Sequence, residues 1–166
     1  MKHGGKRRGS LPEKTVPIGE FNFLVKGLPF GAMESMGDGL PRPAPPLEFA
    51  RDSNGKILRD KAGKVVKHYD DRNADYLRET RRISLLESAL IIKEGLRSDP
   101  EMEWETPAEL AQESKEKYAQ AILQELRDFP LTTGEIIRIQ KAITEVSGLQ
   151  KEQIESMMED LVGEGE

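Results

Sequence analysis

The sequence predicts a mainly α fold, in which a C-terminal unit of three to four helices follows an N-terminal extended arm and a small β-hairpin. Two observations indicate this fold. From residue 71 onward the apolar residues recur at helical spacing, and residues that start helices precede three of these stretches. Before residue 71, glycine and proline interrupt the apolar stretches, as is typical of strands, turns and linkers.

The composition places this chain between proteins that fold alone and proteins that gain order on a partner. Of its 166 residues, 36% are hydrophobic, 33% are charged and 5% are aromatic. We therefore expect partner contacts to supply part of the buried surface. The patterns divide the chain into a disordered basic arm (1–14), a strand or extended arm (15–36), a proline-rich linker (37–50), a β-hairpin flap (51–70), a helical domain (71–162) and a tail (163–166).

Charge is distributed unevenly along the chain. Residues 1–98 hold 19 Lys and Arg against 13 Asp and Glu, a balance of +6, whereas residues 99–166 hold 6 against 17, a balance of -11. Nucleic acid is therefore an unfavourable partner except through the N-terminal arm. The cations of that arm are Lys2, Lys6, Arg7 and Arg8. A solvated tail is favoured over a polyanion contact, because no aromatic residue accompanies these cations.

The segment 15–36 is the most apolar part of the N-terminal half. Ile18, Phe21, Phe23 and Val25 predict one strand, with the last three side chains on one face. A single strand is not stable alone, so it must pair or dock elsewhere. The alternative is an extended arm that gains order on a partner. Phe21 and Phe23 are therefore candidate partner-binding residues.

Two glycine turns in a row predict the flap. Residues 54–58 (NGKIL) are echoed by residues 62–66 (AGKVV), and each glycine is followed after one lysine by two aliphatic residues. This pattern predicts one short hairpin that turns near residues 60–63 and exposes its cations to water. Ahead of the flap, residues 41–46 (PRPAPP) predict a polyproline II linker.

The first predicted helix contains the most apolar stretch of the C-terminal half. Asp71 or Asn73 caps its start, and it runs to about Glu94. Gly95 is predicted to end it in a left-handed conformation. Because the stretch 83–92 is apolar nearly all round, we expect this helix to form the centre of the core.

Two further helices have clear boundaries. A capping box over residues 106–109 (TPAE) starts the second, which is predicted to run to Arg127 before Pro130. Thr132 repeats the capping spacing, and the third helix ends at Gly148. Trp104, the only tryptophan, precedes the second helix and is predicted to plug the core between helices, with an exposed anchor as the alternative.

A fourth helix is predicted from a stripe of apolar residues at helical spacing. The stripe comprises Ile154, Met157, Met158, Leu161 and Val162. Short helices are marginal alone, and methionine side chains adapt to more than one surface. We therefore expect this stripe to contact a partner. The alternative is an ordinary helix packed on the bundle.

The sequence offers no residue set for catalysis, so we do not expect an enzyme. Cysteine is absent, and the two histidines, His3 and His68, lack metal-ligand spacing. Residues 71–75 match the start of a calcium loop, but Tyr76 replaces its glycine and Arg82 its glutamate, so helix capping is favoured. The acidic residues Asp99, Glu101, Glu103 and Glu105 are interpreted as a solvated loop. No catalytic, metal-binding or cofactor-binding residue is predicted.

Neither a membrane span nor a secretion signal is expected from the sequence. No run of about eighteen apolar residues exists, so a spanning helix is not predicted. The basic start, residues 1–9, is not followed by an apolar stretch of signal-peptide type. We therefore expect a cytoplasmic protein.

Two segments resemble tail assembly chaperone-like proteins of long-tailed bacteriophages. These segments are residues 70–97 and 131–161, and the proline-rich residues 41–46 look similar as well. The features shared in the first segment are an acidic start, a tyrosine, arginines and an apolar stretch closed by Gly-Leu: Asp70, Asp71, Tyr76, Arg78, Arg81, Arg82, Leu85, Leu86, Leu90, Gly95 and Leu96. The resemblance implies binding to the tape-measure protein, or to another tail or virion protein, in the host cytoplasm and without cofactors.

Two other functions compete with an assembly factor of this kind. A structural component of the virion head or tail would use the extended arms to lace subunits together, and would remain in the finished particle. A nucleic-acid-binding regulator would use the basic N-terminal arm, but the acidic C-terminal half counts against it. A homo-oligomer is compatible with each of these functions.

Overall fold

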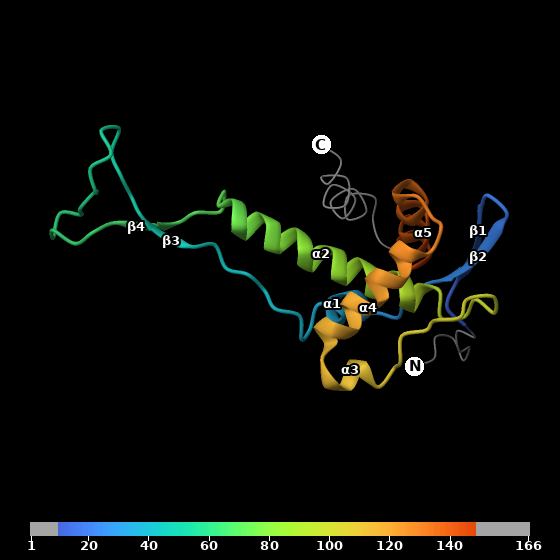
Figure 1. Ribbon diagram of the computed structural model, residues 1–166. Coiled ribbons are helices and arrows are strands. Elements are labelled where there is room, and N and C mark those ends of the chain that lie inside the picture. Colours follow the sequence, from blue (N-terminus) through green and yellow to red (C-terminus); the bar gives the residue numbers. More distant parts are fainter. Residues whose placement is uncertain (1–9, 149–166) are drawn as a thin grey trace, which may run out of the picture. The chain divides into compact units, whose positions relative to one another are not determined.

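The structure is a computed structural model that describes residues 10–148, and these residues form two compact units (Figure 1). Unit 1 contains the described residues 10–40 and 84–148, and unit 2 contains residues 41–83. Five helices and two small antiparallel sheets occur in this described range. The fold is therefore mixed, with helices and two small hairpins, and is broadly as the sequence predicts. The elements are β1 (Glu13–Ile18), β2 (Phe21–Lys26), α1 (Ala32–Met36), β3 (Leu47–Phe49), β4 (Lys67–Tyr69), α2 (Ala74–Gly95), α3 (Leu110–Glu113), α4 (Lys115–Asp128) and α5 (Thr133–Val146).

A β-hairpin stands where the sequence predicts one strand. Strands β1 and β2 pair in register Ile18↔Phe21 and Val16↔Phe23, and Gly19 turns between them with a φ of 58°. Apolar residues continue across the turn, which is why the two strands look like one in the sequence. The predicted face of Phe21, Phe23 and Val25 is confirmed, because residues two apart in a strand share a face.

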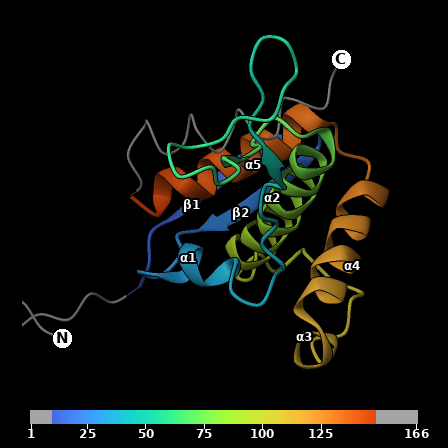
Figure 2. The same cartoon turned by 90° about the vertical axis from the view of Figure 1, so that its left-hand side faces the viewer.

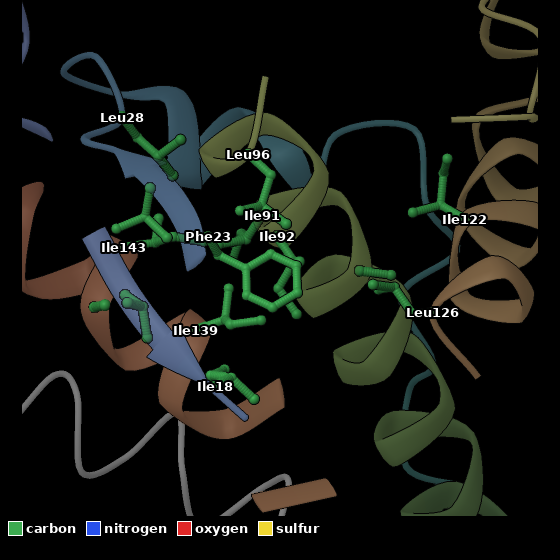
Figure 3. Packing of buried hydrophobic residues seen from close by; sticks show 14 residues of the cluster. Ile18, Phe23, Leu28, Ile91, Ile92, Leu96, Ile122, Leu126, Ile139 and Ile143 are labelled. Carbon is green, nitrogen blue, oxygen red and sulfur yellow. The ribbon is translucent and has the colours of Figure 1, made fainter. Parts of the chain in front are cut away.

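The core of unit 1 joins this hairpin to three helices. Helix α5 packs along β1 and β2 (Figure 2). Side chains from the hairpin, the C-terminal half of α2, α4 and α5 meet in one cluster (Figure 3). Its labelled members are Ile18, Phe23, Leu28, Ile91, Ile92, Leu96, Ile122, Leu126, Ile139 and Ile143. The core is thus not confined to the helices that the sequence predicts as the folded domain.

Helix α2 starts as predicted but ends differently. The Asn73 side chain caps it, since Asn73 Oδ1 accepts hydrogen bonds from the amides of Asp75 and Tyr76, each at 3.1 Å. Gly95 was predicted as a left-handed stop, but it belongs to the helix and is not among the glycines with positive φ. A Cβ at this position would lie closer than 3.0 Å to Ile143 side-chain carbons. Gly95 therefore serves the close packing of α2 and α5.

The second predicted helix is broken in two. Thr106 does not cap a helix; α3 begins only at Leu110, and Ser114 interrupts the chain with an extended backbone (φ -158°, ψ 114°). The Ser114 hydroxyl oxygen then accepts the Lys117 amide and caps α4. Serine competes with the backbone for hydrogen bonds, so it favours a helix start over a helix interior. The chain leaves α4 before Pro130 as predicted.

Helix α5 has the predicted boundaries. Thr132 and Glu135 form a complete capping box: the Thr132 hydroxyl accepts the Glu135 amide, and Glu135 Oε2 accepts the Thr132 amide at 2.7 Å. Gly148 follows the C-terminal end with a φ of 80°. These two signals are local, so the sequence is sufficient to place both ends.

Unit 2 contains a three-armed β-junction, defined here as residues 47–69. The sequence predicts one turn, but Asp52 and Asp60 each start a turn, and strands β3 and β4 form the third arm. At the centre, the Leu58 amide donates to the Ala50 carbonyl, the Val66 amide to Leu58, and the Ala50 amide to Val66, at 2.8–3.0 Å. The two similar segments, 54–58 and 62–66, are therefore equivalent parts of two arms.

The two turns of the β-junction have the same internal hydrogen bonds. Asp52 Oδ1 accepts two backbone amides at 2.9 Å, and Asp60 Oδ1 accepts two at 2.8 and 2.9 Å. Gly55 and Gly63 close these turns with φ values of 78° and 79°, where glycine is strongly favoured. The turn backbone is thus well satisfied by short-range bonds. Nevertheless, no residue from 41 to 82 is buried, so this part of unit 2 has no core of its own.

Candidate protein-binding groove

An apolar groove with a volume of about 560 Å³ opens in unit 1. Its walls come from four places in the sequence: the start of β2, the loop that follows α2, the end of α4 with the segment after it, and Ile139 of α5. The apolar lining includes Phe21, Phe23, Met102, Trp104, Phe129 and Leu131. We define the acid-rimmed groove as this lining together with the acidic residues described below.

Three phenylalanines form one wall of the groove. The ring centroids of Phe21 and Phe129 are 5.6 Å apart, and those of Phe21 and Phe23 are 6.1 Å apart. Phe23 is 4% exposed and belongs to the core, whereas Phe21 is 37% exposed. Phe129 precedes Pro130 and adopts an extended backbone, which brings its ring to the hairpin. Of the two predicted partner-binding phenylalanines, only Phe21 is accessible to a partner.

Asp99 fixes the loop of the groove to the hairpin. The residue is 7% exposed, and its carboxylate Oδ2 accepts the Leu24 amide of β2 at 2.7 Å. The other oxygen, Oδ1, accepts the Glu101 amide at 3.0 Å. A buried carboxylate requires such partners, because burial without hydrogen bonds is costly. Asp99 therefore acts as a structural residue that holds the loop against β2.

Glu125 of α4 fastens the other end of the same loop. Its Oε1 accepts the backbone amides of Glu105 and Thr106, and its Oε2 accepts the Thr106 hydroxyl at 2.7 Å. Thr106 is thus bound to a carboxylate on a different helix instead of starting one. With Asp99 at one end and Glu125 at the other, the loop is held on both sides of Trp104.

Trp104 is intermediate between the two predicted alternatives, a plug of the core and an exposed anchor. Its ring packs against the core cluster but is only partly buried, and it lines the groove. The Lys93 ammonium lies 4.6 Å from the centroid of the Trp104 ring and 5.7 Å from that of Tyr118, within cation–π range. The indole Nε1 is buried and has no hydrogen-bond partner within residues 10–148. An unpaired buried donor costs roughly 1–3 kcal/mol, so this packing of Trp104 is less favourable than a fully paired one.

Burial alters the ionisation of two groups behind the groove. Partial burial lowers the pKa of the Lys93 ammonium, while the charges of Glu125 and Glu94 oppose this effect. Burial raises the pKa of the Tyr118 hydroxyl, and the same two carboxylates raise it further. The Lys93 amine thus faces the rings of Trp104 and Tyr118 and lies in the field of Glu125 and Glu94.

The rim of the groove is acidic. Among residues 10–148, six carboxylates line the groove and no lysine or arginine does: Asp99, Glu101, Glu103, Glu105, Glu125 and Asp128. Asp99 and Glu125 bind backbone amides, whereas Glu101, Glu103 and Glu105 are exposed, as the sequence predicts. An apolar floor with exposed carboxylates around it is suited to an apolar side chain flanked by cations.

Most of the other predicted site residues lie outside the part of the chain that the structure describes. The stripe Ile154, Met157, Met158, Leu161 and Val162 and the cations Lys2, Lys6, Arg7 and Arg8 lie outside the described residues. His68 is exposed on β4. In the part of the chain that is described, no three His, Asp or Glu side chains are grouped so that they could hold a metal ion. No helix of this part is long and apolar enough to cross a membrane.

The sequence interpretation missed most of the groove. Met102, Phe129 and Leu131 were not singled out, and Asp99 was assigned to a solvated loop although it is buried. One usable signal was present, because Phe129 and Leu131 flank Pro130 immediately after an amphipathic helix. No protein-family model, curated protein or solved structure matches the chain.

Proposed function

We propose that this chain is a non-catalytic assembly factor that binds a segment of another protein in the acid-rimmed groove. One observation carries this proposal: aromatic and aliphatic side chains stay accessible in a groove of about 560 Å³ with exposed carboxylates on its rim. Accessible apolar surface with a polar rim is typical of protein-interaction sites. The segment that fits best carries an aromatic or aliphatic anchor between lysines or arginines.

The resemblance in the sequence supplies the class of partner for this proposal. Tail assembly chaperone-like proteins of long-tailed phages bind the tape-measure protein, and the residues that resemble them include the C-terminal half of α2, which belongs to the core of unit 1. We accordingly propose a tape-measure protein, or another tail or virion protein, as the partner.

Site-directed crosslinking tests this proposal. A photoreactive residue replaces Asn22, which is exposed and lines the groove, while the chain is co-expressed with the tape-measure protein of the same genome. The matched control carries the same residue at Gln124, which is exposed on α4 and does not line the groove. We expect a crosslink to the partner from position 22 only. Equal crosslinking from both positions, or none from position 22, would contradict the proposal.

The second candidate function is that of a virion structural component. The observation that favours it is the β-junction, whose backbone groups are hydrogen-bonded to one another although no residue from 41 to 82 is buried. Leu47, Phe49 and Tyr69 are 53%, 48% and 66% exposed on this junction. An element of this kind gains burial when it packs on a neighbouring subunit. Detection of the chain in purified, finished particles would favour this function over a factor that acts only during assembly.

A further inference from the structure

The β-junction of unit 2 and the acid-rimmed groove of unit 1 have complementary surfaces. Residues 47–69 hold six Lys and Arg against three Asp and Glu, a balance of +3. Two of those three acids, Asp52 and Asp60, already accept backbone amides inside their turns. The cations at the equivalent turn positions, Lys56 and Lys64, are exposed. The junction therefore presents positive charge, whereas the part of the groove lining that the structure describes has six carboxylates and no cation.

The apolar surfaces match in the same way. The pairing Leu47↔Tyr69 and Phe49↔Lys67 places Leu47, Phe49 and Tyr69 on one face of the β3–β4 arm. All three are about half exposed or more, and Lys67 Nζ lies 5.6 Å from the centroid of the Phe49 ring. This face is an aromatic and aliphatic surface with a lysine beside it. The acid-rimmed groove is suited to the same combination of an apolar anchor and an adjacent cation.

We infer that the β-junction of one copy docks in the acid-rimmed groove of a second copy, so that the chain associates head to tail. The inference uses the groove of the proposed function and rests on it to that extent; a protein partner and the second copy would then compete for one site. Each copy carries one junction and one groove, so the contact is heterologous. Such contacts produce rings when the rotation closes and open chains when it does not.

A mixing experiment tests this arrangement directly. The junction variant carries Lys56→Glu and Lys64→Glu, which leave intact the backbone amides that bind Asp52 and Asp60. The groove variant carries Glu101→Lys and Glu103→Lys on the exposed rim. Sedimentation velocity measures the mass of each protein alone and of the equimolar mixture. Circular dichroism and urea unfolding establish that both variants fold like the wild type.

The inference predicts a specific set of masses. Wild type forms species larger than a monomer, in a manner that depends on concentration and weakens with salt, because the contact is partly electrostatic. Each variant alone is a monomer. The mixture associates again, because the intact junction of the groove variant meets the intact groove of the junction variant, and the two charge-reversed surfaces are complementary to each other. A chain that carries all four substitutions has opposite charges on both surfaces and associates again.

Matched controls separate position from net charge. The control for the groove variant is Glu109→Lys with Glu113→Lys, which makes the same charge change at exposed acids outside the groove. The control for the junction variant is Arg42→Glu with Arg72→Glu, which makes the same charge change at exposed cations of unit 2 outside the β-junction. Both controls keep the wild-type association. The inference is overturned if wild type is monomeric, if the two test variants still associate alone, or if their mixture stays monomeric. Crosslinking of the partner from position 22 in any of these cases would leave the proposed function standing.

Discussion

Replacement of Gly95 by alanine tests the packing that builds unit 1. Alanine is the better helix former by about 0.5–1 kcal/mol, so propensity alone predicts stabilisation. However, the new Cβ would lie closer than 3.0 Å to carbons of the Ile143 side chain, deep in the core where Ile143 is 0% exposed. Overpacking of this kind costs about 1–3 kcal/mol. Because three carbons of Ile143 would lie this close, the upper part of that range applies, and after subtraction of the propensity gain we expect Gly95→Ala to destabilise the chain by about 1–2 kcal/mol.

The control is the equivalent change at a glycine with free space. Gly134 lies in α5, and a Cβ there would meet nothing within 4 Å. Gly134→Ala should stabilise the chain by roughly 0.4–1 kcal/mol. Urea unfolding, followed by Trp104 fluorescence and by helical circular dichroism, measures both free energies of unfolding. The two alanine variants should therefore shift the unfolding midpoint in opposite directions.

A compensating variant separates the steric cause from others. Ile143→Val removes Cδ1, the atom nearest to the new Cβ, and by itself costs about 0.5–1.5 kcal/mol. In the double variant Gly95→Ala/Ile143→Val the shortest of the three contacts is removed, while those to Cγ1 and Cγ2 remain, so the clash is reduced and the loss should be smaller than the sum of the two single losses. If Gly95→Ala stabilises the chain as Gly134→Ala does, then α2 and α5 do not pack as described and the reasoning fails.

Further predictions concern the groove loop and the start of α5. Asp99→Asn replaces one of the two carboxylate oxygens that accept the Leu24 and Glu101 amides by an NH2 group, which cannot accept either amide. The free energy of unfolding, measured with urea, should fall by about 1–3 kcal/mol. An unchanged midpoint would refute the structural role of this carboxylate. Thr132→Ala removes the capping hydroxyl of α5 and should cost about 1 kcal/mol, whereas no loss would refute the capping box. Hydrogen bonds from the Thr132 amide and hydroxyl lower the pKa of the Glu135 carboxyl in the folded chain. The contribution of Glu135 to stability is therefore fully present above the pKa that this carboxyl has in the unfolded chain, and it is lost as the pH falls through the folded pKa. Glu135→Gln should lose this acid-dependent part of the stability, and identical pH profiles for variant and wild type would contradict the assignment.

Local signals in the sequence were sufficient to predict some elements of the fold. The capping box at Thr132 and the glycine at position 148 place α5 correctly, because both depend on residues close in sequence. The cap at Asn73 and the end of α4 before Pro130 were predicted for the same reason. The repeat of two glycine turns was recognised, although it was interpreted as one hairpin instead of two arms.

The remaining features depend on contacts between distant residues. Thr106 has the signature of a helix start, but Glu125 of α4 binds its amide and hydroxyl. Gly95 has the signature of a helix stop, but its small size is needed against Ile143. In both cases a tertiary contact overrides a local preference. The groove could not be predicted for the same reason, because the start of β2 lies about 75 to 110 positions before the other segments that form its walls.

The central claim is that the acid-rimmed groove binds an apolar side chain flanked by cations. A titration with a short peptide that has lysines on both sides of a Leu-Phe pair, followed by Trp104 fluorescence, measures this most directly. The fluorescence should change to saturation in the wild type, and binding should weaken with salt. Glu101→Lys with Glu103→Lys should abolish it, while Glu109→Lys with Glu113→Lys should not. An unchanged Trp104 signal, or equal binding by these two variants, would contradict the claim.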